Sequence, residues 1–189
     1  WTTTPWTLPS NTALCVGPKI DYVLVNTFNP YTAQPISVVM AEARIASYFN
    51  PAGAEAAMEN YEKGGKILPY RVVAHFKGTD LEGLKYEQLF AYVNPGEGAL
   101  ILGDYVSTED GTGIVHIAPT FGADDAFVAK KAGVPALQLI DKNGNKRPMV
   151  DLKGRFYKLE DLDEDFKQKH MNVDLYKTYA GRFVKNAYD

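Results

Sequence analysis

The sequence of 189 residues contains one cysteine, Cys15. A single thiol can neither form an internal disulfide nor assemble a cysteine-based zinc site, so we expect a reducing, cytoplasmic setting. No apolar run approaches the roughly 20 residues of a membrane-spanning helix, and no basic segment followed by an apolar one opens the sequence. These absences exclude a disulfide-rich scaffold and predict a soluble chain with no membrane partner.

The sequence also lacks an excess of positive charge, since 20 lysine and arginine residues face 23 aspartate and glutamate residues and the formal net charge is −3. A protein that coats nucleic acid needs many basic contacts to phosphates, so this class is excluded, whereas gripping one terminal nucleotide is not. No Walker loop and no Gly-x-Ser-x-Gly elbow is present. The pair Gly111 and Gly113 departs from the dinucleotide fingerprint, because His116 stands where its third glycine belongs.

Length and composition fit one sizeable domain, with 46% hydrophobic and 23% charged residues. The sequence begins with Trp1 rather than methionine, which suggests a piece excised from a longer protein. We therefore expect a single, monomeric domain over residues 1–189.

Short runs of β-branched and aromatic residues separated by turn residues predict a mainly β fold with peripheral α-helices. Their number favours a distorted or partly closed β-barrel. The predicted strands are Ala13–Val16, 21–27, 36–40, 70–76, 86–93, 99–106 and Ile114–Ile117, with a turn at 78–83. Helical spacing predicts helices over 41–49, 54–63, Ala123–Lys131 and 159–170, and a helix or extended return over 174–188. The pair Asn143 and Gly144 predicts a hairpin between 137–140 and 149–150.

Two segments, residues 1–11 and 111–125, are dense in small polar residues, glycine and proline, and together predict a concave site. In an extended segment Thr2 and Thr4 would share one face, with Thr3 opposite. A hydroxyl donates one hydrogen bond and accepts two, so the three threonines suit an ester, a ribose or a water better than a metal. The alternative is a threonine-rich edge strand.

The second segment offers one imidazole and two carboxylates. His116 shares a strand face with apolar neighbours, and a lone histidine in that position is more often a satisfied core residue than a catalyst. Asp124 and Asp125 fall in the first turn of a predicted helix, where free amides and the macrodipole favour carboxylates. One of the two could instead hold an ammonium by a charge-assisted hydrogen bond. The set lacks the helical spacing of hydrolytic zinc motifs.

The two segments together resemble the editing domain inserted into class I aminoacyl-tRNA synthetases of the isoleucine, valine and leucine group. Residues 111–125 are similar to the family's second editing motif, and residues 78–83 with Tyr86 resemble an intervening family turn. Where relatives that edit for valine and leucine carry Arg-Pro-Glu-Thr or Arg-Pro-Asp-Thr, this sequence has Thr4-Pro5-Trp6-Thr7, which is similar to the isoleucine branch. The His-x-Gly-His and Lys-Met-Ser-Lys-Ser motifs of the ATP-binding synthetic site are absent.

The resemblance implies the editing-domain type of barrel and hydrolysis of valine wrongly joined to isoleucine tRNA, together with valyl-adenylate. One missing methylene gives only modest discrimination, and the isoleucine enzyme is the usual illustration of why a second sieve is needed. The implied partners are the acceptor end of the tRNA and the remaining synthetase domains, without metal or organic cofactor. An editing domain of a sibling synthetase and a non-catalytic module that binds the tRNA end are the alternatives.

The resemblance also implies roles for individual residues. Asp125, nine positions after His116, would anchor the substrate's α-ammonium, with Asp124 as its solvated neighbour. His116 and Thr7 would form a wall of the amino-acid pocket, while a general-base role for His116 stays open. The remaining residues would contact substrate or water: Thr2, Thr3 and Thr4 at the ester, ribose and attacking water, Trp1 and Asn11 at the terminal adenosine, and Gly122 in the motif. Because no serine, cysteine or threonine is visibly paired with a base, direct attack by water is expected.

Overall fold

The computed structural model describes residues 2–59, 61–93 and 97–187, and these form two compact units. The first unit comprises residues 16–82 and 102–115, and the second comprises residues 2–15, 83–101 and the chain from 116 onward. The division falls within three strands: β1 (Ala13–Val16), β6 (Glu97–Leu102) and β7 (Ile114–Ile117). The expectation of one domain over residues 1–189 stays a prediction.

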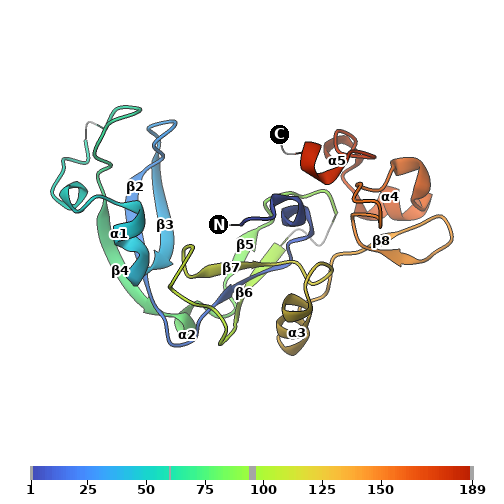
Figure 1. Cartoon of the computed structure of the whole chain (residues 1–189), viewed down its shortest axis with the longest axis horizontal. Coiled ribbons are helices and arrows are strands. Elements are labelled where there is room, and N and C mark those ends of the chain that lie inside the picture. Colours follow the sequence, from blue (N-terminus) through green and yellow to red (C-terminus); the bar gives the residue numbers. More distant parts are fainter. Residues whose placement is uncertain (1, 60, 94–96, 188–189) are drawn as a thin grey trace. The chain divides into compact units, whose positions relative to one another are not determined.

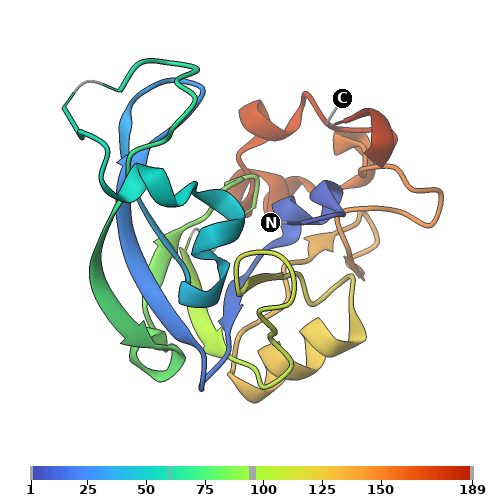
Figure 2. The ribbon, with the colours of Figure 1, turned by 60° about the vertical axis from the view of Figure 1, so that its left-hand side comes forward.

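The first unit is built on an antiparallel sheet of order β3-β2-β4. Its strands are β2 (Asp21–Phe28), β3 (Pro35–Ala41) and β4 (Arg71–Lys77). The central strand places Tyr22 opposite Ala41 on β3 and Phe76 on β4. The short helix α1 (Ile45–Tyr48) covers one face of this sheet, where Ile45 packs on a small buried cluster formed by residues of β2 and β3 and by Phe49 (Figures 1 and 2).

Sequence patterns predict this sheet well and its connections poorly. The strands expected at 21–27, 36–40 and 70–76 are confirmed with small shifts at their ends. The helix expected over 41–49 is confirmed in part, as a 3₁₀ turn η2 (Glu42–Arg44) followed by α1. The turn expected at 78–83 begins with a single helical turn, α2 (Gly78–Leu81).

The helix expected over 54–63 is wrong: Ala54 ends a 3₁₀ turn, η3 (Pro51–Ala54), and the described residues after it form no helix. A continuing helix would need the carbonyls of Gly53 and Ala56 for its own amides. Here Gly53 O accepts hydrogen bonds from Tyr70 N at 3.1 Å and from Arg71 Nη1 at 3.2 Å, and Ala56 O accepts from Arg71 Nη2 at 2.7 Å. Ala56 N still donates to Gly53 O at 3.3 Å, as in a single 3₁₀ turn, but the β4 arginine and Tyr70 N occupy the carbonyls that further helical turns would use.

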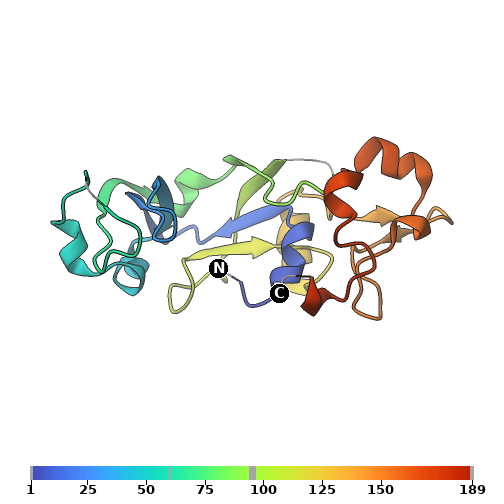
Figure 3. The same cartoon turned by 90° about the horizontal axis from the view of Figure 1, so that it is seen from above.

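The second unit carries most of a four-stranded sheet of order β5-β6-β1-β7, in which β5 is Lys85–Glu87. Figure 3 shows β1 and β7 side by side in this sheet. The strands at Ala13–Val16 and Ile114–Ile117 are confirmed, whereas the strand expected over 86–93 stops at residue 87 and the one expected over 99–106 stops at residue 102. No sheet formed by the described residues closes on itself, so the predicted barrel is not confirmed, while the mainly β fold with helices is.

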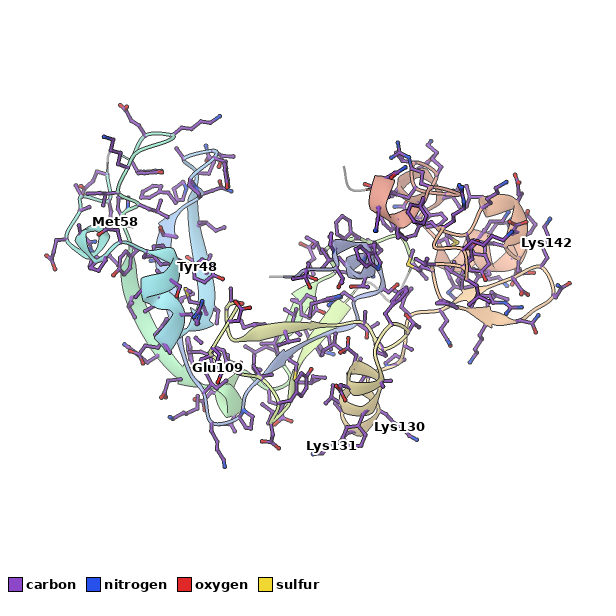
Figure 4. All side chains as sticks on the ribbon, in the orientation of Figure 1. Tyr48, Met58, Glu109, Lys130, Lys131 and Lys142 are labelled. Carbon is purple, nitrogen blue, oxygen red and sulfur yellow. The ribbon has the colours of Figure 1, made fainter. Side chains whose placement is uncertain are left out.

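Helix α3 (Ala123–Lys131) follows this sheet and is confirmed at its predicted bounds. Asp124 and Asp125 lie in its first turn and Lys130 and Lys131 in its last, the latter pair labelled in Figure 4. This placement matches the charge preferences of the helix macrodipole at both ends. Among the described helices, none has the length and apolar character to cross a membrane.

The C-terminal part of the second unit has short elements around a large apolar cluster. They are β8 (Leu139–Ile140), β9 (Lys146–Arg147), η4 (Leu159–Asp161), α4 (Glu164–His170), α5 (Val173–Tyr176) and η5 (Val184–Asn186). The expected hairpin is confirmed, but its second strand is β9 rather than 149–150. The helix expected over 159–170 is divided, because Asp163 has an extended backbone and its carboxylate caps Phe166 N at 2.8 Å. The segment expected over 174–188 contains α5, turns and η5.

Truncating Leu139 should test this cluster. The residue is fully buried among Met149, Phe156 and Leu162, so Leu139→Ala is expected to lower the free energy of unfolding by about 2–5 kcal/mol through lost burial and a cavity. Urea unfolding followed by circular dichroism measures the change. Leu152→Ala is the control, because Leu152 is fully exposed and its truncation should change stability by no more than about 0.5 kcal/mol. Equal effects would contradict the assigned core.

Candidate functional site

The N-terminal threonines lie in a turn rather than a strand. Thr4 N donates to Thr2 Oγ1 at 3.1 Å, and the two hydroxyl oxygens lie 3.4 Å apart, so Thr2 and Thr4 share one side. Thr3 is exposed. The chain then enters a 3₁₀ helix, η1 (Pro5–Ser10), where Pro5 suits a first helical position because it has no amide hydrogen to satisfy.

Both ring nitrogens of His116 are hydrogen-bonded to residues of the N-terminal segment. Thr7 Oγ1 lies 2.8 Å from Nε2, and Asn11 Nδ2 lies 2.8 Å from Nδ1. Thr7 and Asn11 are buried and His116 is half-buried. The two polar segments singled out in the sequence therefore meet at this imidazole, although more than a hundred residues separate them.

The direction of these hydrogen bonds determines where the histidine proton lies. Thr7 Oγ1 also contacts Thr4 O at 2.9 Å, and since a carbonyl can only accept, the one hydroxyl proton of Thr7 goes there. Thr7 must then accept from Nε2, which carries the ring proton. Nδ1 is left as an acceptor for the amide of Asn11, so His116 is the neutral Nε2–H tautomer.

The side-chain amide of Asn11 is hydrogen-bonded through both its nitrogen and its oxygen. Its Nδ2 group donates to Ala13 O at 2.8 Å as well as to His116, and its Oδ1 accepts from the hydroxyl of Tyr86. An amide has two donor hydrogens and one acceptor oxygen, and here all three are used. Tyr86 is therefore part of the site, a role that the sequence did not reveal.

Burial has opposite effects on the two titratable groups of this network. It lowers the pKa of His116 below its ordinary value of 6.5, an effect that the negative charge of Asp125 partly offsets. Burial raises the pKa of Tyr86 to about 12. At neutral pH the imidazole is uncharged and the phenol keeps its proton, which is the protonation pattern that the hydrogen bonds require.

The two aspartates of the second segment differ in their surroundings. Asp125 is half-buried and its Oδ2 accepts from Ala118 N at 2.9 Å, whereas Asp124 is exposed. Among the described residues, none donates a hydrogen bond to Asp125 Oδ1. Gly122, just before α3, lies so close that an added Cβ would sit 3.2 Å from the carboxylate carbon of Asp125. The glycine thus leaves room for a carboxylate that is fixed at one oxygen.

The glycines at the start of the second segment have a structural role within the first unit. Gly113 has a φ of +75°, and a Cβ on it would clash with the side chain of Ala41. Its carbonyl accepts from Tyr22 Oη at 2.6 Å, and the carbonyl of Gly111 accepts from Arg44 Nε at 2.9 Å. The first part of the motif is therefore a turn anchored to β2, β3 and η2.

The structure brings together Thr2, Thr4, Thr7, Asn11 and His116 by hydrogen bonds, with Asp125 near enough to influence the imidazole. Thr3 and Asp124 are exposed, and Trp1 lies outside the described residues. No group of three or more histidine, cysteine, aspartate or glutamate side chains in the described part of the chain is placed to hold a metal ion.

The comparisons with known proteins agree on one group of enzymes. No protein-family model matches the chain. The chain is 68% identical over 191 residues to the isoleucine--tRNA ligase of Bacteroides fragilis and 62% identical over 192 residues to that of Porphyromonas gingivalis. Both matches cover 100% of this chain but only 17% of the relative, so the chain spans about a sixth of these proteins.

Solved structures give the fold. The crystal structure of GlLeuRS-CP1 has a TM-score of 0.54 at 16% identity, covering 98% of this chain and 74% of that one. The editing domain of the P. falciparum cytosolic leucyl-tRNA synthetase has a TM-score of 0.50 at 16% identity, covering 77% of this chain and 55% of that one. The chain therefore belongs, as a segment, to the isoleucine--tRNA ligase family, and it has the fold of leucyl-tRNA synthetase editing domains.

Proposed function

We propose that the chain hydrolyses the ester that joins valine to isoleucine tRNA, and valyl-adenylate as well. The observation that carries this proposal is the neutral His116, hydrogen-bonded at both nitrogens beside the half-buried carboxylate of Asp125. Its family supports the assignment, because a synthetase for isoleucine must reject an amino acid that is one methylene smaller. The proposed partners are the acceptor end of the tRNA and the remaining domains of the synthetase, in the cytoplasm.

Asp125 is suited to anchor the substrate through its α-ammonium. Ala118 N holds one carboxylate oxygen in place, so the second oxygen can accept a charge-assisted hydrogen bond without a large entropic cost. The hydroxyls of Thr2 and Thr4 share one side and would orient the ester, the ribose or the attacking water, with Thr3 as a further contact. We propose direct attack by this water, without an acyl-enzyme, a metal or an organic cofactor.

His116 is proposed as the wall of the amino-acid pocket, together with Thr7. A general base needs a lone pair that can take a proton, and the lone pair of Nδ1 accepts from Asn11 while Nε2 already carries a proton. The complete use of the Asn11 amide likewise favours a supporting role for Asn11 over direct contact with adenosine.

Deacylation of tRNA tests the proposal directly. The chain is incubated with isoleucine tRNA carrying radioactive valine or isoleucine, and the loss of ester is measured over time. We expect loss of valine only. Asp125→Asn keeps the shape but removes the charge that binds the ammonium, so it should lower the rate about 100-fold or more.

Asp124→Asn is the matched control for this substitution, because Asp124 is exposed on the same helical turn and its loss should leave the rate near that of the original chain. Binding of the tRNA end without hydrolysis would instead support a docking module. Hydrolysis with a preference for a different mischarged tRNA would assign the chain to a sibling activity.

Shortening His116 separates the wall from the base. His116→Ala should open space for one more methyl group, so hydrolysis of isoleucyl-tRNA is expected to appear while hydrolysis of valyl-tRNA persists. The ratio of the two kcat/KM values measures this change. If His116 were the base, both rates would fall together and the selectivity would stay unchanged.

The neutral state of His116 makes a separate prediction about pH. Its pKa is lowered in the folded chain, so the unfolded chain binds the proton first as the pH falls through 6.5. The stabilisation is complete above 6.5 and is lost as the pH falls from there toward the lowered folded pKa. Urea unfolding at several pH values below about 7 should show this loss. His116→Gln should reduce the slope, whereas His170→Gln, at an exposed position, should keep it.

A further inference from the structure

We infer that Tyr86 is a positioning residue that holds His116 in one orientation and tautomer through Asn11, and that Gly98 is the residue that makes this possible. The inference deepens the proposed function, and the effect of Tyr86 on substrate selectivity rests on that proposed function. Tyr86 itself lies two hydrogen bonds away from the imidazole, so it acts through Asn11.

The hydrogen-bonded chain crosses the four-stranded sheet of the second unit. In the order β5-β6-β1-β7, Tyr86 belongs to the edge strand β5 and His116 lies on β7. Asn11 lies two residues before the start of β1. To reach Asn11, the Tyr86 side chain must pass over the intervening strand β6. A tyrosine is long enough for such a diagonal reach, provided that the strand below it carries no side chain there.

Gly98 supplies that gap. It is the register partner of Tyr86 in the β5–β6 ladder, and a Cβ built on it would overlap the ring carbons and the hydroxyl of Tyr86. Glycine in a strand is unfavourable unless another group approaches the backbone closely, and the tyrosine ring is such a group. The pair therefore has a specific purpose that β-propensity does not explain.

The Tyr86 hydroxyl satisfies the one acceptor of a buried amide. Asn11 is 6% exposed, and Tyr86 donates to Oδ1 while both amide hydrogens go to Ala13 O and His116 Nδ1. A buried carbonyl oxygen without a donor is costly, so removal of the hydroxyl should drive the Asn11 side chain toward another partner. The imidazole would then lose the donor that fixes Nδ1, and its tautomer and ring orientation would become mixed.

The experiment uses Tyr86→Phe and Gly98→Ala in the full chain, with ¹⁵N-labelled histidine observed by NMR. The original chain should show well-separated ring nitrogen shifts for His116, with the proton on Nε2. Both variants should move these two shifts toward each other, as expected for a mixture of tautomers. The ratio of kcat/KM for valyl- over isoleucyl-tRNA should fall about 10-fold in both, as loss of about one buried hydrogen bond predicts.

Tyr176→Phe is the matched control. Tyr176 is a buried tyrosine of the second unit, whereas Tyr86 is half-buried, and the Tyr176 hydroxyl donates to Tyr157 O at 2.7 Å in the C-terminal cluster. Its loss should reduce stability comparably to Tyr86→Phe but leave both the His116 shifts and the selectivity unchanged, which separates positioning from general stabilisation.

Unchanged His116 chemical shifts in a folded Tyr86→Phe chain would overturn the inference. Changes of the same size in Tyr176→Phe as in Tyr86→Phe would also overturn it. The NMR measurement needs no substrate, so it remains decisive if the original chain hydrolyses neither ester. In that case the proposed function fails while the positioning of His116 by Tyr86 is still tested. Altered shifts with unchanged selectivity would overturn the link between the two.

Discussion

The site depends on one constraint: a half-buried imidazole whose two nitrogens both have partners inside the protein. Polar groups removed from water must be hydrogen-bonded. In a surrounding of low dielectric a satisfied hydrogen bond is stronger than in water, and a buried polar group without a partner is more costly. All the hydrogen bonds of the network are donated in one direction. They lead from the Tyr86 hydroxyl through Asn11, His116 and Thr7 to the carbonyl of Thr4. Each member fixes the next, so the neutral histidine is a property of the whole chain of contacts and not of its strand.

This constraint divides the second polar segment into parts with different physical roles. Gly111 and Gly113 shape a turn in the first unit, where positive φ and close backbone approach exclude side chains. His116 and Asp125, the residues proposed to contact the substrate, lie in the second unit, with Gly122 leaving space beside the carboxylate. A motif that looks continuous in the sequence therefore contains scaffold and site in succession.

The elements that follow from nearby residues are the ones that the sequence predicts. The strands of the β3-β2-β4 sheet, helix α3 and the Asn-Gly hairpin follow from nearby residues and were predicted within a few positions. The helix expected over 54–63 failed because Arg71, from a later strand, takes the carbonyls that a helix would need. Asp163 divided another helix through a cap that outweighs the apolar spacing. The role of Tyr86 in the site was missed because its pairing with Gly98 depends on strand register, which no local pattern reports.

A histidine held at both ends suits the proposed sieve better than an apolar wall would. Isoleucine brings one more methylene than valine, and burying a methylene is worth only about 0.8 kcal/mol. To make room for it the imidazole would have to leave Thr7 and Asn11, and each buried polar group left without a partner costs about 1–3 kcal/mol. The cost of moving the wall therefore exceeds the gain from filling the space. An aliphatic side chain of similar size has no such bonds to lose and could change rotamer, so its discrimination would be weaker. On this argument the hydrogen bonds of His116 serve selectivity by making the wall stiff.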